Sequence, residues 1–308
     1  ARIGGDEFSL LLVGLTDIPE VETLASRLTQ AATQPYDIEG QQVFCTVSIG
    51  IACYPEDGSD ASNLFRDADT ALHAAKTGGK NLYRFFTSRM REHIFRRMRI
   101  EYGLRQALPN NELFLLYQPI VDTQNHRVVG FEALLRWENA ELGSVSPLTF
   151  VPVAEETGRI IPIGQWVLRE ACRFMQQLSQ KGFPGLFIAV NISARQIQQD
   201  TFVHEIKEIL EETGLSPTQL ELEITETVLI ESFEQNVAKL LTIKKWGVKI
   251  ALDDFGTGYS SLTYLKHLPI HKLKIDKSFV DNLTEGGPNI AILDAIMQLS
   301  RSLGLTVV

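Results

Sequence analysis

The sequence has few cysteines and a deficit of positive charge. Its three cysteines, Cys45, Cys53 and Cys172, are too few and too scattered for a disulfide framework or a cysteine-rich zinc site. Lysine and arginine number 29 against 38 aspartates and glutamates, which gives a net charge of -9. This balance argues against DNA or RNA as a partner, because a surface that coats phosphates needs an excess of cations.

Long apolar segments are also missing. No apolar run approaches the ~18 residues that cross a membrane, and no signal peptide precedes the fold. We therefore expect a cytoplasmic protein, with any tether to the inner membrane lying in segments upstream of Ala1. Because the first residue is not Met and motif-bearing sequence starts at once, we also expect this sequence to be a piece of a longer one.

What is present is the composition of a globular protein. Hydrophobic residues make up 44% of the 308 residues and charged residues 22%, a balance that allows buried cores to form. At roughly 150 residues per domain, this length predicts two domains.

Residues 1–86 mix short strands and helices. A tight turn lies within Arg2–Phe8, and a helix is predicted from Pro19 to about Gln34. Val43–Cys53 alternates with period two and predicts one strand, whereas Leu64–Lys76 has helical spacing and is followed by two glycines. This order predicts an α+β domain.

Residues 87–107 carry apolar side chains at helical spacing between many arginines. We interpret this segment as a connecting helix with a solvated basic face, and a phosphate-binding helix is the alternative. The domain boundary is placed here.

Residues 108–308 alternate strands with longer amphipathic helices. The strand candidates are Leu113–Tyr117, Val129–Leu135, Leu186–Asn191, Leu220–Ile224, Lys249–Asp253, Lys272–Ile275 and Leu305–Val308. The helix candidates are Ile163–Lys181, Phe202–Thr213, Phe233–Trp246 and Ile290–Leu303. This repetition favours a parallel sheet, either open or closed into a barrel. The short polar connection Asp122–Arg127 makes the first two strands a hairpin, so the first strand would run antiparallel to the rest.

Oxygen-bearing side chains recur late in successive strands of this region. They are Glu132, Asn191, Glu223, Asp253 and Asp254. In a parallel barrel the carboxyl ends of the strands converge on one face, and such ligands suit Mg²⁺ or Mn²⁺. Two ions roughly 3.5–4 Å apart would activate a water and stabilise the leaving oxygen in phosphodiester hydrolysis. Lys274 would add a cation that holds the water or neutralises charge on the phosphate.

Each of these residues also has a structural explanation. Asp254 is typical of a turn, and Glu223 and Glu226 of a solvated rim. The set favours a site, because polar side chains buried at the same end of successive strands cost stability if they are left unpaired. His267 and His271 have metal-ligand spacing, but Pro269 between them argues against a helix and so against a metal pair.

Five motifs in this order resemble the signature of the EAL domain family. They are Glu132–Trp137, Val190–Ser193, Glu221–Glu226, Asp253–Leu262 and Leu273–Asp276. Known EAL enzymes hydrolyse cyclic di-GMP to linear pGpG on a modified (β/α)₈ TIM-like barrel whose first strand is antiparallel, using Mg²⁺ or Mn²⁺. The resemblance implies the same fold, reaction and pair of ions here.

The resemblance also implies a role for individual residues. The ligands of the first metal ion would be Glu132, Asn191, Glu223 and Asp253, and those of the second Asp253 and Asp254. The residues in contact with the dinucleotide would be Gln118, Arg136 and Asn191. Lys274 would position the hydrolytic water. Glu226 would anchor the loop Asp254–Ser261, which couples metal binding to dimerisation in the family, so a homodimer is expected.

The N-terminal part resembles a GGDEF domain, the diguanylate cyclase fold. The matching residues are Gly4, Gly5, Asp6, Glu7 and Phe8, with Lys76 and Lys80 in a later motif. By resemblance Asp6 would hold a metal ion, Glu7 would assist at the reacting hydroxyl, and the two lysines would bind the triphosphate of GTP. Lys80 stands where arginine is commoner, and the first half of that domain, with a further metal-binding Asp, is not in the sequence.

Together these observations predict three segments. Residues 1–86 form the C-terminal half of a GGDEF-type domain, 87–107 a connecting helix, and 108–308 an EAL domain that lacks its last strands, since a further metal-binding Glu would follow Val308. The predicted function is hydrolysis of cyclic di-GMP, with the GGDEF part regulatory or a second catalytic unit. The alternatives are a receptor that binds cyclic di-GMP without cutting it, and a diguanylate cyclase restrained by the EAL domain.

Overall fold

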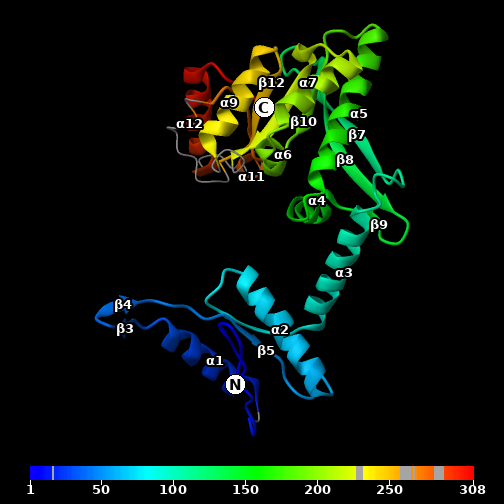
Figure 1. Cartoon of the computed structure of the whole chain (residues 1–308). Coiled ribbons are helices and arrows are strands. Elements are labelled where there is room, and N and C mark those ends of the chain that lie inside the picture. The colour runs from blue at the N-terminus through cyan, green and yellow to red at the C-terminus, as the bar shows by residue number, and fades with distance from the viewer. Residues whose placement is uncertain (16, 227–231, 257–264, 266–267, 281–287) are drawn as a thin grey trace. The chain divides into compact units, whose positions relative to one another are not determined.

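The computed structural model describes the chain except residues 16, 227–231, 257–264, 266–267 and 281–287 (Figure 1). It divides into two compact units, Ala1–Met98 and Arg99–Val308. The boundary between them falls within helix α3 (Ser88–Leu104). None of the helices among these described residues is long and apolar enough to span a bilayer.

The first unit contains three pairs of short strands and two helices besides its part of α3. The antiparallel pairs are β1 (Arg2–Gly4) with β2 (Glu7–Phe8) and β3 (Tyr36–Ile38) with β4 (Gln41–Val43). The parallel pair is β5 (Ile49–Ile51) with β6 (Tyr83–Phe85). The helices are α1 (Ile18–Ala32) and α2 (Ala61–Thr77). This content confirms the predicted α+β class.

Local chemistry fixes where these two helices begin and how α2 packs. The carboxylate of Asp17 accepts a hydrogen bond from the backbone N–H of Glu20, and that of Asp60 accepts one from Asn63, which satisfies helix N–H groups that have no partner within the helix. A Cβ atom at Gly50 would lie 2.1 Å from the Ala68 carbonyl oxygen. Glycine is therefore required where β5 meets α2.

The prediction of one strand over Val43–Cys53 is wrong. β4 ends at Val43 and β5 begins at Ile49, so the intervening residues belong to no strand. Among the described residues no strand pairs with residues 44–48, and the Phe44 side chain is largely exposed. Alternating side chains favour a strand only where neighbouring backbone groups complete its hydrogen bonds.

The second unit is built on one eight-stranded sheet (Figure 1). In spatial order its strands are β7 (Leu113–Val121), β8 (Val128–Asn139), β10 (Phe187–Asn191), β11 (Leu220–Thr225), β12 (Lys249–Phe255), β13 (Lys272–Ile275) and β14 (Thr306–Val307). β9 (Gly143–Val145) pairs with β8 outside this order. β7 is antiparallel to β8, and every later step from β8 to β14 is parallel. The predicted antiparallel first strand is confirmed.

Helices connect the parallel strands. They are α4 (Pro147–Glu156), α5 (Ile160–Gln180), α6 (Ala194–Gln198), α7 (Phe202–Thr213), α9 (Phe233–Lys245), α11 (Lys277–Val280), α12 (Pro288–Leu303) and the 3₁₀ turn η1 (Pro217–Gln219). α5 contacts β10 and β8, α9 contacts β12, and α12 contacts β14. Because a parallel connection must return the chain to the same end of the sheet, each helix crosses over one face of it.

Strand alternation divides the sheet into an apolar and a polar face. Leu222, Ile250 and Leu252 belong to one large buried apolar cluster. Their neighbours Glu221 and Glu223 point to the opposite face, since successive side chains of a strand alternate. The polar side chains of several strands therefore share one side of the sheet.

We expect Phe150→Ala to lower the stability of the chain by about 3–5 kcal/mol, the usual cost of removing a buried aromatic ring. Phe150 is fully buried and meets the Trp137 ring edge to face, with the centroids 5.5 Å apart. Leu148→Ala on the same helix is the matched control, because Leu148 is 90% exposed and its change should be nearly neutral. Chemical denaturation of the two variants measures this difference, and equal midpoints would contradict it.

Candidate active site

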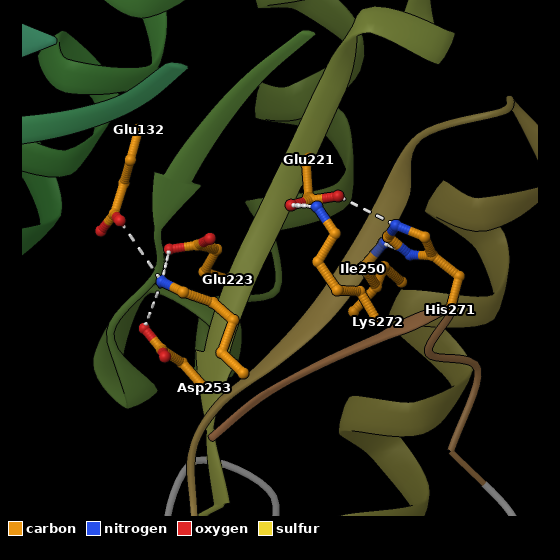
Figure 2. Close-up of polar contacts among 8 residues, drawn as sticks. Glu132, Glu221, Glu223, Ile250, Asp253, His271 and Lys272 are labelled. Carbon is orange, nitrogen blue, oxygen red and sulfur yellow. Dashed lines mark hydrogen bonds and ion pairs between the residues drawn. The ribbon is translucent and has the colours of Figure 1, made fainter. Parts of the chain in front are cut away.

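A lysine and three carboxylates from four strands meet on the polar face of the sheet (Figure 2). The Lys274 Nζ atom lies 2.6 Å from Glu223 Oε2 and 2.9 Å from Asp253 Oδ2. It also lies 3.4 Å from Glu132 Oε2. A fifth strand contributes Asn191, whose Nδ2 donates to Glu132 Oε1 over 2.9 Å.

The register of the sheet explains this convergence. Asn191 of β10 stands opposite Glu223 of β11, and Asp253 of β12 stands opposite Thr225 of β11. On the other side, Gln118 of β7 is opposite Glu132 of β8. Residues opposite one another in a ladder share a face, so strands far apart in the sequence place their polar side chains together.

The four charged groups perturb one another. Burial raises the pKa of Glu223 to about 8, and the carboxylates of Glu132 and Asp253 add to this effect while Lys274 opposes it. Burial disfavours the charged form of Lys274, but Glu223, Asp253 and Glu132 outweigh it and raise the lysine pKa. Lys274 is therefore a permanent cation near neutral pH, whereas Glu223 titrates there.

The carboxylates fit a divalent cation. Glu223 is 1% exposed, and its second oxygen, Oε1, is buried without a hydrogen-bond partner among the described residues. Leaving such an atom unpaired costs free energy, which a bound cation would recover. Carboxylate and amide oxygens are also the ligands that Mg²⁺ and Mn²⁺ prefer.

In this arrangement the ammonium stands where a cation would sit. No group of three or more His, Cys, Asp or Glu side chains in the described ranges is spaced to hold a metal ion as it stands. The Lys274 Nζ atom lies within reach of all three carboxylates and takes up their charge. Divalent cations bound there would share these carboxylates with the ammonium.

Asp253 and Asp254 differ in their surroundings. The pairing of β12 with β13 shifts register between Leu252 and Phe255, so these two residues form a bulge. Asp254 is exposed and has a left-handed backbone with φ 53°, and burial together with the charge of Asp253 raises its pKa. Bulges of this kind redirect side chains beside active sites, and here Asp253 meets Lys274 at 2.9 Å.

Glu226 and the dinucleotide candidates lie around this centre. The Gly256 backbone N–H donates to Glu226 Oε1 over 3.1 Å, which ties the end of β11 to the end of β12. Within the predicted loop Asp254–Ser261, residues 257–261 lie outside the described residues. Gln118 lines a pocket together with Glu132, Glu223 and Lys274. Arg136 is not among the described residues that line it, and its Nη1 donates to the Leu135 carbonyl.

In the first unit, the structure brings together two of the predicted GGDEF residues. Lys76 Nζ lies 3.3 Å from Glu7 Oε1, and both side chains are about half exposed. Asp6 and Lys80 are exposed. The turn between β1 and β2 uses Gly5 at φ 49°, a left-handed conformation that glycine adopts without strain.

Sequence reasoning missed a second polar network on the same face (Figure 2). The Glu221 side chain is fully buried and accepts from Lys272 Nζ at 2.6 Å, and its other oxygen lies 2.9 Å from His271 Nε2. Burial opposes ionisation of Glu221, but His271 and Lys272 outweigh it and lower its pKa. One feature of the sequence could have revealed this network: Glu221 precedes Glu223 by two residues, and Lys272 precedes Lys274 by two residues. His267 lies outside the described residues, so the rejected histidine pair is not tested.

A parallel sheet with one antiparallel first strand, and with acidic residues gathered on its polar face, is a TIM-barrel-like architecture. The chain belongs to the EAL domain family, whose sequence model matches residues 102–308. The model described as "Diguanylate cyclase, GGDEF domain" matches residues 1–82. Proteins with EAL domains are generally metal-dependent phosphodiesterases.

Curated relatives match the whole length of this chain. The chain is 42% identical over 308 residues to the "Bifunctional diguanylate cyclase/cyclic di-GMP phosphodiesterase MucR" of Pseudomonas aeruginosa, covering 100% of this chain and 45% of MucR. It is 38% identical over 308 residues to the "Cyclic di-GMP phosphodiesterase PdeR" of Escherichia coli, covering 100% of this chain and 46% of PdeR. The chain thus spans about half the length of these relatives.

A solved structure shares the fold of the second unit. "PaMucR Phosphodiesterase, c-di-GMP complex" is 42% identical with a TM-score of 0.65, over 68% of this chain and 85% of that one.

We expect the affinity of the chain for Mn²⁺ to rise with pH up to about 8 and then level off, because the raised pKa of Glu223 makes the metal displace a proton below that value. The stability of the metal-free protein changes with pH in the opposite direction. The folded state holds a proton that the unfolded state has lost above pH 4.5, so stability falls as pH rises through about 8.

Calorimetric Mn²⁺ titrations at several pH values measure this effect. Glu223→Gln is the control, because it cannot ionise and should show weaker binding without that rise. An affinity independent of pH in the unsubstituted chain would show that Glu223 does not ligate the ion.

Proposed function

We propose that residues 102–308 hydrolyse cyclic di-GMP to the linear dinucleotide pGpG. The observation that carries this proposal is the convergence of Glu132, Glu223 and Asp253 on Lys274, with one buried Glu223 oxygen unpartnered among the described residues. Similarity to a phosphodiesterase solved as a c-di-GMP complex supports the choice of substrate. The proposal includes the three segments predicted from the sequence, which are a GGDEF-type part (1–86), a connecting helix (87–107) and an EAL domain (108–308).

Two Mg²⁺ or Mn²⁺ ions belong to this proposal. Glu132, Asn191, Glu223 and Asp253 would hold the first, and Asp253 with Asp254 the second. When bound, such ions activate a water and stabilise the leaving oxygen of a phosphodiester. Because Asp253 stands in the bulge of β12 beside the exposed Asp254, the two carboxylates can serve neighbouring ions.

Lys274 acts as a donor in this scheme. Its raised pKa keeps it protonated, so it cannot accept the proton of the attacking water. The ammonium instead orients that water by hydrogen bonding or offsets negative charge that builds up on the phosphate.

The remaining site residues bind the dinucleotide or fix the loop after β12. Gln118, from the strand beside Glu132, lines the pocket and offers an amide to the dinucleotide, while Arg136 offers a guanidinium to a phosphate. Glu226 fixes the start of the loop after β12 through Gly256. A homodimer is also proposed, and it rests on the family resemblance of that loop.

We expect Asp253→Asn to lower the turnover of cyclic di-GMP at least about a hundredfold, because it removes a charged ligand from the reacting centre. Glu138→Gln on β8 is the control, since Glu138 is exposed and lies outside the carboxylate cluster. Anion-exchange separation of cyclic di-GMP from pGpG, with Mg²⁺ and then Mn²⁺, measures the rates. Near-normal turnover by Asp253→Asn would refute the role of Asp253.

The same assay distinguishes hydrolysis of cyclic di-GMP from binding without hydrolysis. Metal-dependent appearance of pGpG supports the phosphodiesterase. Calorimetric binding of intact cyclic di-GMP without any product would replace it with a receptor, since no bond would then be broken.

A second candidate function is GTP binding by the first unit, favoured by the contact between Glu7 and Lys76. We expect a non-hydrolysable GTP analogue to bind with Mg²⁺ and Lys76→Met to weaken it about tenfold or more, because a charge-assisted contact to the triphosphate is lost. Arg27→Met on α1 is the control, and calorimetry of the full chain measures both. Equal affinities would remove Lys76 from the site. Conversion of GTP to cyclic di-GMP would favour the restrained cyclase instead.

A further inference from the structure

The contact between Glu221 and Lys272 repeats the contact between Glu223 and Lys274. Figure 2 labels Glu221, Lys272 and Glu223. Both glutamates lie on β11 and both lysines on β13, and each residue of the first pair precedes its counterpart by two positions. Each lysine Nζ lies 2.6 Å from its glutamate. Since side chains two apart on a strand share a face, the two pairs form successive layers on one side of the sheet.

Both pairs reach across an intervening strand. β12 lies between β11 and β13, and its residue Ala251 stands opposite Glu223 on one side and Lys272 on the other. Ala251 is fully buried and small, so it leaves room for the acidic and basic side chains to meet over it. The Glu221–Lys272 pair, called the lower pair from here on, therefore joins two strands that share no backbone hydrogen bonds.

Backbone pairing does not hold Lys274 level with Asp253. The regular ladder between β12 and β13 runs through Ala251 and Leu252, and the register then shifts before Phe255. The bulge lies at the level where Lys274 must meet the carboxylates. Backbone pairing resumes between Phe255 and Ile275, and β14 pairs with the other edge of β13. Contacts below the bulge add to these in setting the position of β13.

His271 supplies such contacts immediately below. Its backbone N–H donates to the Ile250 carbonyl, and its Nδ1 accepts from the Ile250 N–H, each over 3.0 Å. Because Nδ1 accepts, Nε2 carries the proton and donates to Glu221. The imidazole thus links the edge of β12 to the carboxylate that also holds Lys272.

The surroundings of Lys272 further restrict its position. Its Nζ lies 4.4 Å from the centroid of the Phe187 ring, a cation–π contact. That ring is held close to β8, where a Cβ atom at Gly130 would lie 2.7 Å from Phe187 Cδ1. The lysine is therefore held between a carboxylate and an aromatic ring, and it has little freedom to shift along the sheet.

We propose that Glu221, Lys272 and His271 are positioning residues that set the register of β13 and so place the Lys274 ammonium among the carboxylates of the active site. This inference rests on the proposed function of that site. Lys272 also lines the pocket that contains Lys274, but the contacts of the three residues described above are with one another, with Phe187 and with β12. They therefore act through the strand that carries Lys274.

The test replaces the lower pair by apolar side chains of similar length, Glu221→Met with Lys272→Met. Removing both charges together avoids an unpaired buried charge, so the fold is retained. We expect kcat for cyclic di-GMP to fall about tenfold to a hundredfold while KM changes little, as for a displaced reacting group. Lys249→Met is the control, since Lys249 also faces Phe187 but is exposed, and it should retain full activity.

A double-mutant cycle separates positioning from general damage. In a Lys274→Met background the paired substitution should change the residual kcat by less than about twofold, because the group it positions is already gone. An equal loss in both backgrounds would overturn the proposal. His271→Ala, at a partly exposed position, keeps the Glu221–Lys272 pair and should give a smaller loss in the same direction.

A second readout needs no turnover. Pulse labelling of the full chain with acetic anhydride, read by mass spectrometry, should modify Lys274 faster in the paired variant than in the unsubstituted chain. Lys239, which donates to three carbonyls of residues 197–199, should stay equally protected. Unchanged labelling of Lys274 would overturn the positioning role. Absence of pGpG from the unsubstituted chain would overturn the proposed function alone, and labelling would still decide this inference.

Discussion

The structure of the second unit depends on balancing charge that is buried on the polar face of its sheet. The carboxylates of Glu132, Glu223 and Asp253 meet there, and Lys274 supplies one positive charge for the three of them. Buried charges without partners cost several kcal/mol. The excess of negative charge gives the site its attraction for divalent ions, and the lysine allows the strands to pack when such ions are absent.

Much of the fold could be predicted because its signals are local. Alternating apolar residues and the short polar connection Asp122–Arg127 were enough to predict the hairpin of β7 and β8 and the parallel strands after it. The interruption between Val43 and Ile49 was not predictable in this way. The sequence there alternates as a strand does, but strand formation depends on neighbours that no local pattern reveals.

The site was partly predictable for the same reason. Parallel strands bring their ends together, so Glu132, Asn191, Glu223 and Asp253 were expected to converge. The pairing of Glu221 with Lys272 and His271 depends on a diagonal across β12, which exists only in the assembled sheet. Pro269 was a sound argument against a histidine pair, but it carried no information about the carboxylate that His271 meets.

The repeated spacing of the glutamates and lysines has a consequence for folding. A slip of β13 by two residues would keep every side chain on its face and would bring Lys272 beside Glu223, so one ion pair would be kept while the buried Glu221 lost its ammonium. His271 also opposes this slip, because its ring accepts from Ile250 only in the native alignment. One imidazole immediately before a strand of four residues thus acts against a misaligned sheet.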